Sequence, residues 1–208
     1  MSIQRWQVVG TRVSYEDDWL KVVTDTCRAG DGHLLGDYHT LQYPDWVNVV
    51  ALTEAGKVLL VREYRHARRS ISLGLPGGAA EPGELPLAAA QRELREETGY
   101  TAPRWIELGK SAVNAATHGN LLWSFLAWDA KQTQSPSLDA TEDAELVVED
   151  CGEVLRAFGN DGEAQSLHLA SLLLAVRFLL SDRSDALSAA RASLLESSTA
   201  PSRTDERP

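Results

Sequence analysis

The sequence predicts an α/β protein in which a small antiparallel sheet precedes a larger domain. The first observation is a set of three runs rich in Val, Thr, Tyr and Leu, at residues 6–15, 19–27 and 34–43. Turn residues separate these runs, which is typical of a β-meander. The second observation is that apolar strands and a helical pattern follow this segment, which favours strands packed against helices.

The larger domain is expected to begin near Asp45. Two apolar runs, 47–52 and 58–61, flank a turn that ends at Gly56, and together they predict a buried hairpin. A loop rich in glycine and proline, residues 74–83, then leads into a helix.

That helix is expected to start at Pro86 and to stop at Gly99, since proline suits the first turn and glycine the C-terminal cap. Leu87, Ala90 and Leu94 recur at helical spacing and are expected to form its apolar stripe.

The rest of the chain predicts one more strand, one more helix and two polar segments. Residues 121–128 read as a strand, 129–143 as a long loop, and about 163–180 as a buried helix. Residues 197–208 are small and polar, so we expect a disordered tail.

Composition excludes several classes of protein. The 208 residues carry a net charge of −10, which argues against a nucleic acid as partner, because nonspecific nucleic-acid binding relies on clustered Lys and Arg. Cys27 and Cys151 lack any CxxC or zinc spacing, so neither a disulfide scaffold nor a zinc site is expected.

The chain also lacks the marks of secretion and of membrane insertion. No apolar signal segment follows Met1, and the apolar run 169–180 is interrupted by Arg177 and is shorter than the roughly 20 residues of a membrane span. We expect a cytoplasmic protein without a membrane partner.

One pattern of glycine and acidic residues carries the chemistry. It runs Gly78-x5-Glu84-x7-Arg92-Glu93-Leu94-x-Glu96-Glu97-x-Gly99-Tyr100. On a helix, positions 93, 96 and 97 share one face, so three carboxylates are brought together.

The simplest interpretation of such a face is that it is solvated. Electrostatics favours another: at ~5.5 Å two negative charges repel by roughly 3 kcal/mol at an effective dielectric near 20, but by under about 1 kcal/mol in water. A partly enclosed cluster therefore favours a cation, and oxygen ligands favour Mg²⁺, or Mn²⁺, bridging to substrate phosphates.

These residues resemble the Nudix box, the signature of the Nudix hydrolase family. All seven of its polar and glycine positions match, and Tyr100 stands where the family usually has an aliphatic residue. Residues 5–180 are similar to the branch of ADP-ribose pyrophosphatases and nucleoside-diphosphate-sugar hydrolases.

The resemblance implies an α/β/α sandwich with a mixed sheet, preceded by an N-terminal antiparallel β-subdomain. It places the subdomain at residues 1–44, the Nudix domain at 45–196 and the tail at 197–208. In this branch the subdomain commonly exchanges between two subunits, so the resemblance also implies a homodimer with composite sites.

Roles carry over from the family one residue at a time. Glu93, Glu96 and Glu97 match its metal-binding carboxylates, and the carbonyl of Gly77 is a further candidate ligand. Glu84 and Arg92 match family positions that orient the helix and its carboxylates. The glycines at positions 77, 78 and 83 are expected to form the tight loop.

Four arginines gather in an otherwise acidic chain, at positions 62, 65, 68 and 69. Guanidinium groups match phosphate oxygens, so this strand end is a candidate pyrophosphate clamp. Arg65 is preferred and Arg62 is second. Arg68 and Arg69 fit a solvated loop equally well, and His66 is expected to be structural.

The tryptophans of the N-terminal part offer a flat surface for a base. Trp46 is the preferred stacking residue, ahead of Trp6 and Trp19, although tryptophans in strands more often belong to a core.

The general base of related enzymes is a glutamate outside the box. Aligning the run 146–148 places it at Glu142, with Glu145 or a box glutamate as alternatives. Ala115 stands where the branch often has proline, which leaves the sugar open, and His118 is expected to be a loop residue.

The resemblance implies Mg²⁺-dependent hydrolysis of ADP-ribose or another nucleoside diphosphate sugar to a nucleoside monophosphate and a sugar phosphate. Two alternatives stay open: a Nudix hydrolase of dinucleoside polyphosphates or nucleoside triphosphates, and a non-catalytic nucleotide-sugar sensor.

Overall fold

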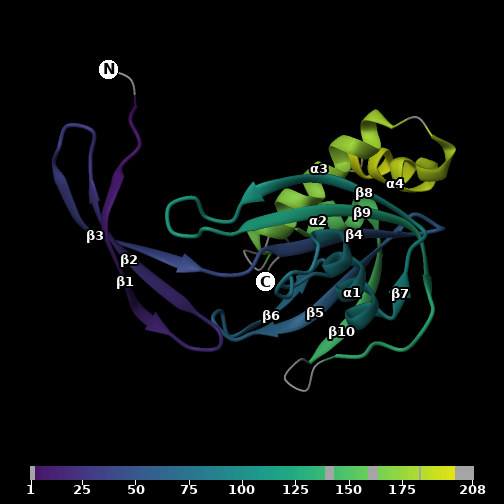
Figure 1. Ribbon diagram of the computed structural model, residues 1–208. Helices are drawn as coiled ribbons and strands as arrows, with labels where there is room; N and C mark the ends of the chain where they lie inside the picture. The colour runs from purple at the N-terminus through teal and green to yellow at the C-terminus, as the bar shows by residue number, and fades with distance from the viewer. Residues whose placement is uncertain (1–2, 139–142, 159–163, 183, 200–208) are drawn as a thin grey trace, which may run out of the picture. The chain divides into compact units, whose positions relative to one another are not determined.

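The computed structural model describes residues 3–138, 143–158, 164–182 and 184–199 (Figure 1). The chain divides into two compact units. The first comprises residues 1–45 together with 111–122, and the second comprises 46–110 together with 123–208.

The first unit is a three-stranded antiparallel sheet, which confirms the predicted meander. Its strands are β1 (Gln7–Glu16), β2 (Lys21–Arg28) and β3 (Leu34–Gln42), in the order β1-β2-β3. The segment 111–122 joins this unit through the Leu41 amide, which donates to the carbonyl of Thr117 at 2.7 Å. No local sequence pattern indicates that this segment belongs with the meander.

The second unit contains a seven-stranded sheet. Its main order is β10-β5-β4-β9-β7, with β6 paired to β5 and β8 paired to β9. The strands are β4 (Trp46–Thr53), β5 (Lys57–Arg65), β6 (Ser70–Gly74), β7 (Tyr100–Thr101), β8 (Arg104–Ala112), β9 (Leu121–Gln132) and β10 (Ala144–Asp150). The helical elements are α1 (Pro86–Thr98), α2 (Cys151–Ala157), α3 (Ser166–Ser181), η1 (Asp185–Leu187) and α4 (Ser188–Thr199).

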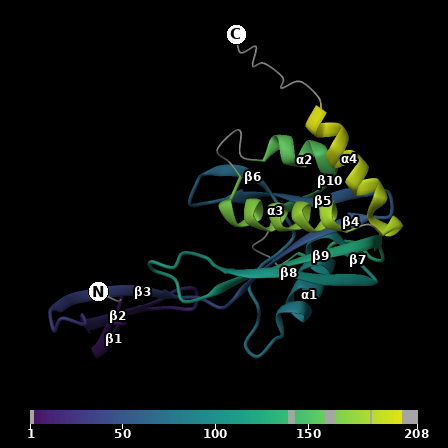
Figure 2. The ribbon, with the colours of Figure 1, turned by 90° about the horizontal axis from the view of Figure 1, so that it is seen from above.

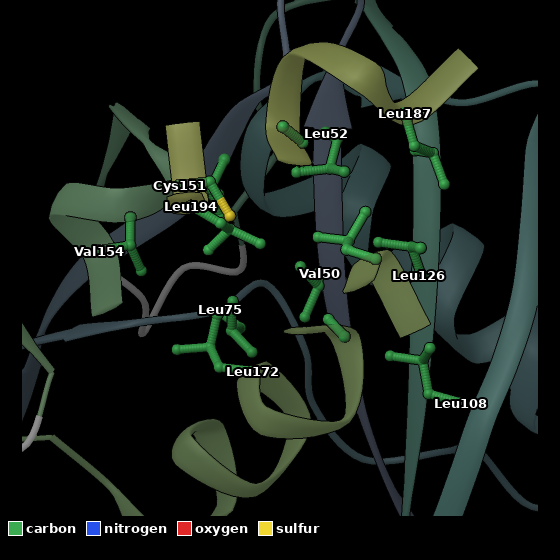
Figure 3. Close-up of a cluster of buried hydrophobic side chains, with 14 of the residues drawn as sticks. Val50, Leu52, Leu75, Leu108, Leu126, Cys151, Val154, Leu172, Leu187 and Leu194 are labelled. Carbon is green, nitrogen blue, oxygen red and sulfur yellow. The ribbon is translucent and has the colours of Figure 1, made fainter. Parts of the chain in front are cut away.

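Alternation along the central strands creates a core on each face of this sheet. Val47, Val49 and Ala51 of β4 belong to the cluster that includes Leu94 of α1. The intervening Val50 and Leu52 belong to the cluster beneath α2, α3 and α4 (Figure 3). Successive strand residues point to opposite faces, so one strand serves both cores. Helix α1 lies on one side of the sheet and α3 on the other (Figure 2), which confirms the predicted α/β/α sandwich.

The predicted loop over 129–143 is wrong in its first part. Strand β9 continues to Gln132, because Lys131 and Gln132 pair with Thr101 and Tyr100 of β7. This pairing forms only in the tertiary fold, and no local sequence pattern predicts it. Tyr100 also packs against the α1 core, so the aromatic residue fills a core position.

The sequence predicts a single final helix at about 163–180, so α2 and α4 are elements that it does not predict. Helix α3 covers 166–181 where the sequence predicts about 163–180. Helix α4 continues to Thr199 and so includes the first residues of the expected disordered tail; residues 200–208 lie outside the described part of the chain. Among the described residues, no helix has both the length and the apolar character needed to cross a bilayer.

Candidate active site

Helix α1 starts and stops where the sequence predicts. Pro86 occupies its first turn, and Gly99 caps its C-terminus in the left-handed conformation at φ 75°, donating its amide to the Arg95 carbonyl at 2.9 Å. The predicted stripe needs one correction: Ala90 and Leu94 are buried, but Leu87 is 40% exposed and Ala89 is buried instead. Leu87 lies in the first turn, where it lines an open groove together with Trp105 of β8 and Trp123 of β9.

The glycine-containing segment that follows β6 runs extended along β4. The carbonyls of Pro76 and Gly78 accept from the amides of Val49 and Val47, both at 2.9 Å. In an extended chain the N–H and C=O of one residue point to the same edge, and successive residues alternate. Gly77 therefore turns both its polar groups away from β4. Its N–H donates to Oε2 of Glu97 at 2.9 Å, which ties the loop to α1.

Arg92 holds the acidic side chains of this region together. It donates to both carboxylate oxygens of Glu84, from Nε at 3.1 Å and from Nη2 at 3.0 Å. Its Nη1 donates to Glu93 at 2.9 Å and to Glu96 at 3.2 Å. Nη2 also reaches the carbonyl of Ala79 at 3.0 Å. One guanidinium thus fixes three carboxylates and ties the helix to the loop in front of it.

The electrostatics of this cluster follow from partial burial. The side chains of Arg92, Glu84 and Glu93 are only 19%, 16% and 14% exposed. The hydrogen bonds from Arg92 hold the pKa of Glu84 below its usual range, and in return they raise the pKa of Arg92. Both groups are therefore charged at neutral pH.

The cluster keeps an excess of negative charge. Four glutamates, at positions 84, 93, 96 and 97, share the positive charges of Arg92 and of Arg95, which lies 3.6 Å from Glu96. Among the described residues, no three acidic, histidine or cysteine side chains stand in ready geometry around one metal position, because Arg92 occupies the space between Glu93 and Glu96. The donor set still suits a divalent cation, because its atoms are all oxygen, its side chains are partly buried, and its negative charges outnumber the positive charges of the two arginines. Small rotations of the Glu93, Glu96 and Glu97 side chains would be required.

Two glycines allow the loop to approach its neighbours closely. A Cβ placed on Gly77 would lie 3.0 Å from Cα of Asn48 in β4, so this position has no room for a side chain. A Cβ placed on Gly78 would lie 2.7 Å from Cδ of Glu93, so the Glu93 side chain would have to move. Gly83 has φ +80° and serves the turn ahead of Glu84.

The arginine-rich segment ends β5 and begins the turn to β6. Arg62 donates from Nη1 to Oε2 of Glu145 at 2.8 Å, across the β5–β10 pair. Arg65 forms an ion pair with Glu63, while its own Nε is buried without a hydrogen-bond partner among the described residues. The structure thus brings Glu145, the alternative base, next to Arg62. Glu142, the preferred base, lies outside the described residues.

Trp46 lies beside the box loop. It starts β4, is half-buried, and its backbone forms a bridge with Ala79. In the first unit, Trp6 packs edge-on against Tyr38 with ring centroids 5.7 Å apart, and Trp19 is 82% exposed. His118 stacks on Tyr43 at 5.4 Å.

Sequence reasoning missed a group of buried polar side chains behind the loop: Asn48, Ser124, His168 and Ser171. Each interrupts an apolar run, which is the signal that could have revealed it. A polar side chain in a buried strand or helix face needs a partner, and that partner is often structural or functional.

Comparison with known proteins extends these observations. The NUDIX domain family matches residues 42–166, and the nucleoside diphosphate sugar hydrolase N-terminal domain matches residues 6–41. The ADP-ribose pyrophosphatase of Bacillus subtilis (strain 168) is 27% identical over 140 residues, which is 67% of this chain and 74% of that protein.

One further relative is similar in sequence, and one solved structure is similar in fold. The methanol dehydrogenase activator of Bacillus methanolicus is 26% identical over 140 residues, again 67% of this chain and 74% of that protein. A crystal structure of an ADP compounds hydrolase superposes with a TM-score of 0.75 and 22% identity, covering 86% of this chain and 97% of that one. At this identity the superposition supports the fold alone.

Proposed function

Because the chain belongs to the Nudix hydrolase family, we propose that it hydrolyses the pyrophosphate of ADP-ribose or of another nucleoside diphosphate sugar, with Mg²⁺ as cofactor. The observation that carries this proposal is the acidic cluster of α1 beside the extended segment 75–79: the Gly77 amide donates to Glu97, and Arg92 holds Glu93 and Glu96. The match of residues 6–41 to an N-terminal domain of nucleoside diphosphate sugar hydrolases favours this class of substrate.

Glu93, Glu96, Glu97 and the carbonyl of Gly77 are proposed to hold the metal. When bound, the ion would neutralise the pyrophosphate and lower the pKa of a water molecule. Glu84 and Arg92 are positioning residues: their paired hydrogen bonds fix the rotation of α1 and the distance of the loop from it.

Substrate contacts are proposed for Arg65, Arg62, Trp46 and the backbone of Gly78. The guanidinium groups of Arg65 and Arg62 would bind phosphate oxygens, which for Arg62 requires exchange of its Glu145 partner. Trp46, next to the loop, would stack on the base. Water attacks phosphorus, a phosphorus–oxygen bond of the pyrophosphate breaks, and a glutamate accepts the proton of the water. Glu142 is proposed for that step, with Glu145 or a box glutamate as alternatives.

A substrate panel tests the proposal. Release of nucleoside monophosphate would be measured with ADP-ribose, ADP-glucose, GDP-mannose, dinucleoside polyphosphates and nucleoside triphosphates, with Mg²⁺, with Mn²⁺ and with chelator. We expect turnover of a diphosphate sugar that depends on the metal. Preference for a triphosphate or a dinucleotide would favour the other hydrolase class, and saturable binding without turnover would favour the sensor.

We further propose a homodimer in which the first unit is covered by a second copy. Every residue of β1 is exposed, and its exposed side chains include Val8, Val9, Val13 and Tyr15. A three-stranded sheet with this much exposed apolar surface is typical of a protein interface. The free, buried thiols of Cys27 and Cys151 fit a reducing compartment such as the cytoplasm.

A further inference from the structure

His168 is a polar side chain buried in an apolar helix. It lies in the first turn of α3 and is 4% exposed. Its Nδ1 accepts a hydrogen bond from the backbone amide of Leu75 at 2.9 Å. The imidazole is therefore neutral, with its proton on Nε2. We propose that His168 is a positioning residue for the proposed hydrolysis: it fixes the backbone that carries Gly77, and through Gly77 the carboxylate of Glu97.

The first step of the argument is the direction of the backbone groups. The amide of Leu75 and the amide of Gly77 lie on the same edge of the extended segment, since residues two apart point alike. The first meets His168 and the second meets Glu97. Pro76 between them has no N–H, so His168 provides the nearest anchor on this edge ahead of the site.

The second step is that the ring has little freedom. A Cβ on Gly74 would lie 3.0 Å from Cε1 and 3.2 Å from Nε2 of His168, so the ring packs directly on the backbone of Gly74. The side chain of Leu75 belongs to the same buried cluster as Leu172 of α3 (Figure 3). Backbone and side chain of this segment are thus both held against α3.

A second contact from α3 supports the same loop from β4. Asn48 donates from Nδ2 to Oγ of Ser171 at 3.2 Å, and Ser171 and Ser124 are hydrogen-bonded at 2.8 Å. Asn48 lies directly beneath Gly77, where an added Cβ would meet its Oδ1 at 2.9 Å. His168 and Ser171 are three positions apart and share one face of α3, so this face supports the loop through two contacts, one to Leu75 and one through Asn48.

The inference rests on the proposed function for its kinetic part, so the test combines kinetics with a measurement that needs no turnover. The variants are His168→Leu, which removes the acceptor at similar size, and His168→Asn, whose Oδ1 replaces Nδ1 as acceptor. Leu179→Ala is the control: it is a fully buried position eleven residues along the same helix, about 16 Å away at 1.5 Å per residue.

In His168→Leu we expect kcat to fall about 10- to 100-fold while KM changes by less than about threefold, because the loop is misplaced and no substrate contact is lost. Leu179→Ala should lower stability without this loss of kcat, and His168→Asn should restore kcat to within about threefold of wild type.

Amide hydrogen exchange of the full chain without added metal gives the independent readout. We expect exchange at Leu75 and Gly77 to accelerate about tenfold or more in His168→Leu, and to be unchanged relative to the rest of the chain in Leu179→Ala. Unaltered protection of Gly77 in His168→Leu, or a kcat loss no larger than that of the control, would overturn the proposal. If wild type hydrolyses no member of the substrate panel, the proposed function fails, and the exchange comparison alone decides the role of His168.

Discussion

At the scale of single residues, the site combines side chains with opposite requirements. Glu93 and Glu96 repel each other and are held by Arg92, whereas Glu97 is held by the backbone amide of Gly77. The Arg92 guanidinium and the Gly77 amide thus stabilise the three carboxylates in the folded chain, and a divalent cation would stabilise the same carboxylates during catalysis. Exchange of Glu97 for glutamine removes the charge and keeps a side-chain oxygen that can accept from the Gly77 amide.

Replacement of Glu97 by Gln is expected to lower kcat by at least about 100-fold, since a carboxylate ligand is lost. The melting temperature should stay close to that of wild type, because the amide oxygen can still accept from Gly77. Steady-state kinetics and thermal unfolding check this, with Glu107→Gln, an exposed glutamate on β8, as control. Unchanged turnover in Glu97→Gln would remove the metal assignment.

His168 also predicts a pH dependence of stability. Burial, together with the nearby charge of Arg65, lowers the pKa of His168 to about 4. The unfolded chain takes up this proton near pH 6.5. Between these two pH values the unfolded state binds more protons than the folded state. The contribution of His168 to the free energy of unfolding is therefore fully present above about pH 6.5. As the pH decreases below that value, the free energy of unfolding falls by up to about 1.4 kcal/mol per pH unit.

Urea unfolding at pH 7, 6 and 5 measures this effect. Wild type should lose more free energy of unfolding over the range than His168→Asn, which has no titrating group at 168. Glu84 also has a lowered pKa and weakens folding in acid, but it is present in both proteins and cancels in the difference. Equal losses in the two proteins would show that His168 does not carry this penalty.

At the scale of elements, α1 serves both the core and the site. Ala90 and Leu94 face the sheet, while the glutamates project from another part of the helix surface. The C-terminal cap continues this role, since the Gly99 carbonyl accepts from Thr133 at 2.9 Å and Ser137 donates to the Glu96 carbonyl at 2.8 Å. The helix end therefore also fixes the loop that leads toward the proposed base.

Two leucines of α1 provide a matched comparison. Leu94 is fully buried, so Leu94→Ala should lower the free energy of unfolding by about 2–5 kcal/mol. Leu87 is 40% exposed, and Leu87→Ala should cost less than about 1 kcal/mol. Chemical denaturation distinguishes them. Similar losses would mean that Leu87 packs as the helical spacing suggests and that the exposed groove beside it is covered.

At the scale of the whole molecule, the first unit has strands but little enclosed core. In its three-stranded sheet, the buried residues are Val23, Thr24 and Cys27 of β2, while β1 is exposed throughout. A sheet of this kind gains stability from another surface. This is the physical basis for proposing a second copy of the chain.

Light scattering at micromolar concentration should give a mass of about twice 22.7 kDa, as expected for a two-fold dimer. Val13→Asp places a charge on the exposed apolar surface of β1 and should shift the mass toward that of one chain. A single-chain mass for wild type would rule out both the dimer and composite sites.

The amino-acid sequence was sufficient for the elements whose signals are local. The meander, the buried hairpin, the ends of α1 and the family follow from turn residues, alternation, caps and the spacing of the box. These features depend on residues a few positions apart, which the covalent chain keeps close together whatever the rest of the fold does.

Only the tertiary structure decided the features that join distant positions. The extension of β9 needs β7, the pairing of Arg62 with Glu145 needs β10, and the support of Leu75 by His168 needs α3. Each of these contacts forms between segments that are brought together by burial of the two cores. A contact of that kind leaves no periodicity in the sequence, and of these three only the His168 contact leaves a trace, which is a polar residue inside an apolar run.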